Sequence, residues 1–259
     1  EQKQIDAREM ETYAAMVDNM DYHIGRVLNY LDASGQRDNT IVIFISDNGA
    51  QGFGPGMARA FPQDWIDENF DTSFENIGKI NSYAYLGPHW ARASTAPMRM
   101  FKGFSSDGGL KVPAIISYPG KLEARAGTFT NQLTTVLDLP ATFLDIAKTT
   151  HPGTSYKGRQ VHPYTGVSLL PFLNGESEII HEPDDVVAWE LNNSRAVRKG
   201  DWKIILLPGR FGTGDWELFN IKNDPAERTD LSEAEPEKRS EMIAEWEKYA
   251  RNNGVIIAE

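Results

Sequence analysis

The run Ile-Val-Ile-Phe-Ile-Ser at residues 41–46 is the feature that most restricts how this chain can fold. It is short, rich in β-branched side chains and free of polar alternation, which is typical of a strand covered on both faces, as in a parallel sheet. Residues 6–33 carry apolar side chains at three- and four-residue spacing, which predicts a helix with one apolar face that ends near Ser34-Gly35. A helix followed by such a strand predicts an α/β fold.

The predicted strand ends on Asp47, Asn48 and Gly49, and two interpretations fit this sequence. In open α/β sheets, ligands bind beyond the carboxyl ends of the strands, and Ca²⁺ and Mg²⁺ accept carboxylate and amide oxygens. Asp47 and Asn48 are therefore candidate metal ligands. The competing interpretation is a plain Asn-Gly turn that binds nothing.

Two more side chains could contribute to a site. Lys102 lies six residues before Gly108-Gly109, ahead of a predicted strand at 112–118, and a lysine at the mouth of a sheet can bind a tetrahedral anion as a point charge. His89 is a candidate substrate contact in the stretch 50–100, which lacks a clean period, and loops of this length are usually functional or disordered. The competing interpretation for both is an ordinary surface residue.

The remaining sequence predicts two kinds of structure. Residues 132–136 are a candidate short strand, and a helix is expected directly after them. From about residue 179, three or four strand candidates with a tight turn at 199–201 predict an antiparallel sheet. Residues 236–252 predict one helix packed on that sheet, with Trp246 buried between them.

Composition excludes several functional classes. A net charge of −11 argues against a general nucleic-acid binder, and no run approaches the ~18 apolar residues that a membrane span requires. The absence of cysteine rules out disulfides, thiolate metal sites and a cysteine nucleophile within these 259 residues. The compartment stays open, because the periplasm and the cytoplasm of a bacterium both fit.

Several segments together resemble the formylglycine-dependent sulfatases, and the bacterial arylsulfatases most closely. Their order and spacing fit the family over nearly the whole chain, which is more specific than any single motif such as ISDNGAQG or KGFSSDGGLKVP. The family usually has Glu before the paired glycines and Arg before Val-Pro, where this chain has Asp107 and Lys111, and both changes keep the charge. The matching segments are residues 16–52, 85–120, 130–147, 195–208 and 214–231.

This resemblance implies a fold and a site. Residues 1–178 would be the C-terminal part of a sulfatase catalytic domain, with part of an alkaline-phosphatase-like, mixed but mainly parallel sheet flanked by helices. Residues 179–259 would form a small C-terminal α+β subdomain, in which one helix packs on an antiparallel sheet. Asp47 and Asn48 would bind a divalent cation, Ca²⁺ or alternatively Mg²⁺, and Lys102 would contact the substrate sulfate during catalysis.

The resemblance also implies what lies outside this chain. The formylglycine of the family is made from Cys or Ser in a C-x-P-S-R sequence, and it lies in the N-terminal half with further metal ligands and cations. We therefore expect this chain to be the C-terminal half of an arylsulfatase that hydrolyses a small sulfate ester, with the N-terminal half as its partner. Alone, the chain is expected to be inactive and to expose an apolar patch, covered by a second chain or by self-association.

Two other functions remain open. A phosphodiesterase or phosphonate monoester hydrolase of the same superfamily would share Asp47 and Asn48 and differ in pocket residues. An inactive relative that acts as a binding module is the non-enzymatic alternative, which Lys102 and the intact Asp-Asn pair argue against. A C-x-P-S-R sequence upstream of Glu1 would favour the sulfatase, whereas residues other than Cys or Ser in its place would favour the binding module.

Overall fold

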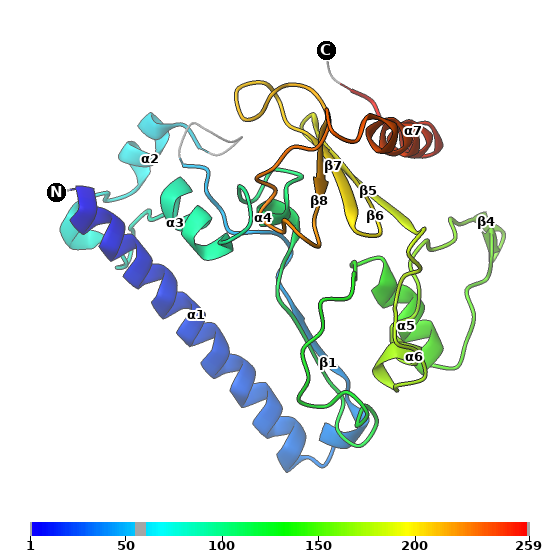
Figure 1. The fold of residues 1–259 in the computed structure, drawn as a ribbon. Helices are drawn as coiled ribbons and strands as arrows, with labels where there is room; N and C mark the ends of the chain where they lie inside the picture. Colours follow the sequence, from blue (N-terminus) through cyan, green and yellow to red (C-terminus); the bar gives the residue numbers. More distant parts are fainter. Residues whose placement is uncertain (1, 55–60, 258–259) are drawn as a thin grey trace. The chain divides into compact units, whose positions relative to one another are not determined.

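The structure is a computed structural model that describes residues 2–54 and 61–257 (Figure 1). The chain divides into two compact units: Glu1–Tyr30, Phe44–Ala114 and Val186–Glu259 form the first, and Leu31–Ile43 and Ile115–Asp185 form the second. The helices are α1 (Gln2–Ala33), α2 (Gln63–Asn69), α3 (Gly87–Thr95), α4 (Asp107–Leu110), α5 (Asp138–Ile146), α6 (Leu170–Leu173) and α7 (Pro236–Asn253), with short 3₁₀ helices η1 (Arg37–Asn39) and η2 (Phe74–Asn76). The strands are β1 (Val42–Ile45), β2 (Ala114–Ser117), β3 (Ser155–Tyr156), β4 (Arg159–Gln160), β5 (Val186–Leu191), β6 (Ser194–Lys199), β7 (Trp202–Leu206) and β8 (Glu217–Asn220).

The predicted helix at residues 6–33 is present as α1 and begins earlier, at Gln2. It ends where Gly35 adopts the left-handed conformation, with φ +68°, and donates its amide to the carbonyl of Asp32. The predicted apolar face is largely uncovered: no described residue of α1 is buried, and Met16 is 66% exposed.

β1 and β2 are hydrogen-bonded to each other in a two-stranded sheet. β1 forms within the predicted strand 41–46, and β2 forms where the sequence predicts the next strand. Just past β1, the amide of Ser46 donates to the carbonyl of Pro113 at 3.3 Å. Within the described ranges no third strand joins this sheet, and Ile45 and Ile115 remain 39% and 62% exposed. The apolar strand is therefore less covered than its sequence predicts.

The predicted short strand at residues 132–136 is wrong, because residues 132–135 form no regular element and residues 136–137 form the turn that leads into α5. The amide of Thr135 donates to Oδ2 of Asp138 at 2.6 Å, and the amide of Asp138 donates to the carbonyl of Thr135 at 3.1 Å. The Asp138 side chain therefore accepts the hydrogen bond that the Thr135 amide would donate to a neighbouring strand in a sheet.

The predicted antiparallel sheet is present, in the order β5-β6-β7-β8. The turn at residues 199–201 joins β6 to β7 as predicted, and α7 packs against β6 and β7 (Figure 1). Trp246 of α7 is only 4% exposed, which confirms its predicted burial. It belongs to an apolar cluster with Val197, Ile204, Leu218 and Met242.

The other face of this sheet packs on the segment that carries Lys102. Successive side chains of a strand point to opposite faces, so Phe219 lies on the face opposite Leu218. Phe219 belongs to a second apolar cluster, which contains Phe101 and Phe104. The sheet therefore supports the backbone on both sides of Lys102.

Within residues 50–54 and 61–100, the helices α2, η2 and α3 interrupt the predicted irregular stretch, and its residues 55–60 lie outside the described ranges. Pro88, in the first turn of α3, lacks an amide hydrogen that this position would leave unbonded. Trp90 ties α3 to α1 through a 2.8 Å bond from its indole nitrogen to the carbonyl of Asp6. Across residues 2–54 and 61–257, no helix combines the length and apolar character that crossing a membrane requires.

Candidate functional site

Asp47 and Asn48 lie in a bend directly after β1. Asp47 is exposed and Asn48 is half-buried. The backbone carbonyl of Asn48 accepts a 3.0 Å hydrogen bond from the hydroxyl of Ser46, which holds the bend closed. Neither the Asp47 nor the Asn48 side chain hydrogen-bonds or ion-pairs with any residue that the structure describes. Two adjacent oxygen-donating side chains thus remain available to a ligand.

Gly49 brings this bend against the paired glycines of the second motif. Its amide donates to the carbonyl of Gly109 at 2.9 Å. A Cβ atom at Gly49 would lie 1.9 Å from the carbonyl oxygen of Gly108, so no larger residue fits without moving one backbone or the other. The Asp-Asn motif and the Gly-Gly motif are therefore packed backbone to backbone.

Lys102 belongs to the same region. Its amide donates to the carbonyl of Ala50 at 3.0 Å, so its backbone lies beside the loop that starts at Asp47. The Lys102 side chain is half-buried and forms no ion pair within the described part of the chain. His89 is exposed near the start of α3, and no hydrogen bond joins it to Asp47, Asn48 or Lys102 among the described residues.

Asp107, the residue before the paired glycines, belongs to a buried cluster of charges that sequence analysis missed. The ammonium of Lys203, in β7, contacts Oδ1 of Asp107 and Oε1 of Glu227, the latter at 2.7 Å. The Lys203 side chain is 1% exposed. The sequence offers a weak signal: Asp107 precedes Gly-Gly, but Lys203 looks like an ordinary outward-facing residue of an alternating strand.

The charges of this cluster shift one another's pKa values. Burial acts to raise the pKa of Asp107, but the Lys203 ammonium, hydrogen bonding and the nearby Lys111 and Arg198 together hold it below its usual value. Burial acts to lower the pKa of Lys203, and the two carboxylates raise it. Burial and the Asp107 charge raise the pKa of Glu227 despite the pull of Lys203. One ammonium thus keeps Asp107 ionised more firmly than Glu227.

A second polar cluster lies in the unit that contains α5. Asp138 is fully buried and accepts the amide of Val167 at 3.0 Å. The ring of His181 lies between Asp138, 3.1 Å from its Nε2, and Asp185, 3.3 Å from its Nδ1. These contacts connect the start of α5 to the 181–185 segment, which is a structural use of a histidine that sequence analysis had not singled out.

The donor chemistry of Asp47 and Asn48 fits a hard cation, since both offer oxygen. Among the described residues, no three His, Asp or Glu side chains cluster in a way that could hold a metal ion. Ca²⁺ takes about six to eight oxygen ligands, so these two residues would fill only part of its coordination shell.

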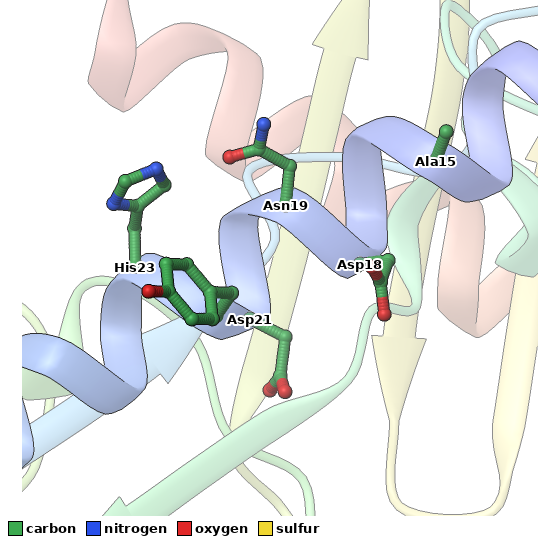
Figure 2. Close-up of a pocket in the computed structure, with 6 residues that line it drawn as sticks. Ala15, Asp18, Asn19, Asp21 and His23 are labelled. Atoms are coloured by element: carbon green, nitrogen blue, oxygen red, sulfur yellow. The ribbon is translucent and has the colours of Figure 1, made fainter.

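A surface hollow runs along α1, away from these motifs in the sequence. Figure 2 shows that its lining comes from one helix, so it is the grooved outer surface of α1 rather than a cleft between elements. The lining residues are Ala15, Asp18, Asn19, Asp21, Tyr22 and His23.

Comparisons with known proteins agree with the sequence motifs. The family model for sulfatases matches residues 1–149, and the model for the C-terminal part of N-sulphoglucosamine sulphohydrolase matches residues 99–251. An uncharacterized sulfatase of Schizosaccharomyces pombe is 39% identical over 100% of this chain and 46% of its own length. An arylsulfatase of Klebsiella aerogenes is 36% identical over 65% of this chain and 36% of its own length.

Solved structures share the fold. The crystal structure of Ps i-CgsB in complex with k-i-k-neocarrahexaose has a TM-score of 0.64 and 23% identity, over 96% of this chain and 46% of that one. The chain therefore spans less than half the length of the proteins it matches. Because the sulfatase model covers more than half of these 259 residues, this chain belongs to the sulfatase family.

Proposed function

We propose that this chain is part of an enzyme that hydrolyses sulfate esters, with aryl sulfates as the substrate class. Membership of the sulfatase family supports the reaction, and the similarity to the Klebsiella aerogenes arylsulfatase supports the substrate class. The observation that carries the proposal is the backbone contact between two motifs far apart in sequence. Through Gly49–Gly109 and Ala50–Lys102, the loop of Asp47 lies beside the backbone of Lys102.

Each candidate residue has a role that its chemistry allows. Asp47 and Asn48 would bind a divalent cation through their side-chain oxygens, Ca²⁺ in preference to Mg²⁺ because Ca²⁺ tolerates irregular ligand sets. Such a cation, when bound, neutralises charge that develops on the sulfuryl oxygens. Lys102 would donate hydrogen bonds to the same oxygens and stabilise their charge in the transition state. His89 remains a candidate substrate contact.

The proposal includes a second segment of the same protein, an N-terminal half that brings the formylglycine and the remaining ligands. Uncovered apolar surface near β1 supports it. Ile45 and Ile115 are partly exposed in the β1–β2 sheet, although strand side chains of this kind are normally covered. α1 adds an exposed apolar face, with Tyr13, Met16, Val17, Met20, Val27 and Tyr30 all more than 40% exposed.

The test uses the full-length protein that carries this chain and the hydrolysis of 4-nitrophenyl sulfate. Removing a preorganised charge-stabilising donor typically costs ~10²–10³ in kcat, so Lys102→Ala should lose about that much. The matched control is Lys79→Ala, which removes an exposed lysine of the same unit and should leave turnover unchanged.

Two results would contradict the proposal. Unchanged turnover by the Lys102→Ala protein would remove Lys102 from the site. Faster hydrolysis of an aryl phosphodiester than of the aryl sulfate by the unmodified protein would instead favour a phosphodiesterase of the same superfamily.

A further inference from the structure

The buried charges behind Gly108-Gly109 are placed where they can control the candidate site. Glu227 binds both other members of the cluster: its carboxylate accepts the Asp107 amide at 3.1 and 3.3 Å and contacts the Lys203 ammonium. Glu227 itself is 2% exposed and holds a positive φ of +52°, which is uncommon for a residue other than glycine. A strained residue persists only where its surroundings fix it, so this geometry is firmly imposed.

From this cluster, close backbone contacts lead to the loop that contains Asp47 and Asn48. Asp107 is followed by two glycines with no room for a side chain: a Cβ at Gly108 would lie 2.3 Å from the carbonyl oxygen of Arg99, and one at Gly109 would lie 2.1 Å from that of Phe104. Gly109 then accepts the amide of Gly49. A shift of the Asp107 backbone must therefore move the loop that contains Asp47 and Asn48.

The segment 99–105, which carries Lys102, is held by the same C-terminal sheet. Near its start, Arg99 pairs with Glu217 of β8 at 3.0 Å, and both side chains are mostly buried. Near its end, the amide of Ser105 donates to the hydroxyl of Ser194 in β6 at 2.8 Å. Together with Lys203 of β7, three neighbouring strands of the C-terminal sheet hold this segment.

We propose that the Lys203–Asp107–Glu227 cluster is a positioning device, through which the C-terminal sheet sets the backbone of the Asp47–Asn48 loop and of Lys102. The inference rests on the proposed roles of Asp47, Asn48 and Lys102. Apolar residues of similar volume would often stabilise a core at least as well as a buried ion cluster. A charged cluster at this point is explained by the geometry that it imposes on the adjacent loop.

The first test is hydrogen–deuterium exchange of the 259-residue chain, which needs neither metal nor activity. Asp107→Asn keeps the shape of the side chain and removes its charge. We expect the amides of Gly49 and Lys102 to gain about tenfold or more in exchange rate relative to the amide of Ile204 inside β7, which reports unfolding of the sheet as a whole. Asp107→Glu, which restores the charge that contacts Lys203, should recover most of the protection.

Two variants complete the design. Glu241→Gln is the matched control, because it weakens the partly exposed Lys199–Glu241 pair of the same unit and should leave Gly49 protected. If Asp107→Asn fails to fold, Glu227→Gln keeps an acceptor for the Asp107 amide and should show the same pattern with a smaller amplitude.

The second test is kinetic and uses the full-length protein. Misplacing reacting groups by ~1 Å can cost about 10²-fold, so Asp107→Asn should lower kcat by about that factor with little change in KM. Unchanged exchange at Gly49, or an equal loss of protection at Gly49 and Ile204, would overturn the positioning role. If the exchange result holds while the unmodified full-length protein hydrolyses no sulfate ester, the proposed function fails and the positioning of the loop stands.

Discussion

Replacing Lys203 by Met removes the cation that contacts both Asp107 and Glu227 and keeps most of the aliphatic side chain. The Lys203 side chain is 1% exposed, and Met fills a similar volume at this buried position, so little apolar packing is lost. The cost is therefore mainly electrostatic: two buried carboxylates lose their shared partner. Removing one partner of a buried ion pair typically costs ~3–5 kcal/mol, a large part of the ~5–15 kcal/mol that keeps a domain folded.

The assay is urea unfolding of the 259-residue chain at pH 7, followed by tryptophan fluorescence. Arg8→Met is the matched control, since Arg8 pairs with Glu11 on the surface, where such pairs contribute less than ~1 kcal/mol. Adding Asp107→Asn to Lys203→Met should recover part of the loss, because one uncompensated charge disappears. A change of less than about 1 kcal/mol for Lys203→Met alone would refute the reasoning.

Three further predictions follow from single residues. Trp246→Ala should destabilise the chain by ~3–5 kcal/mol in the same urea assay, because Trp246 is 4% exposed between α7 and the sheet; a near-neutral result would contradict its packing role. Because folding lowers the pKa of Asp107, its ionised form stabilises the folded chain fully above pH 3.8, the ordinary pKa, and this stabilisation is lost as the pH falls through the lowered pKa. When the free energy of unfolding is measured against pH in acid, Asp107→Asn should lack this component. In the full-length protein, Asp47→Ala should abolish retention of Ca²⁺ in equilibrium dialysis, and undiminished retention would exclude Asp47 as a ligand.

The elements that the sequence predicts well are those whose local pattern and tertiary packing agree. The alternating strands and the apolar stripe of α7 both require Trp246 to be buried, and it is. The strand predicted at residues 132–136 does not form, because the amide of Thr135 donates to the Asp138 carboxylate. A hydrophobicity pattern does not report such a local bond. The uncovered face of α1 carries the same pattern as a buried helix, since periodicity states which side is apolar and not what covers it.

The candidate site could likewise be predicted only in part. Asp47, Asn48 and Lys102 could be singled out because their residue types suit cation and anion binding, and Gly49 because it allows a turn. The contact of Gly49 with Gly109 is a long-range backbone bond that composition does not encode. Lys203 and Glu227 could not be identified either, because a charged residue in a strand or loop normally faces solvent, and only the fold buries these two beside Asp107.

The most direct test of the proposed function is a recombination assay with an aryl sulfate. The purified 259-residue chain is measured alone and then with the N-terminal half of the same protein carrying a formed formylglycine. We predict no hydrolysis by the chain alone, hydrolysis when the two halves are combined, and little hydrolysis when the combined chain carries Lys102→Ala. Hydrolysis by the chain alone, or full activity of the Lys102→Ala combination, would contradict the account.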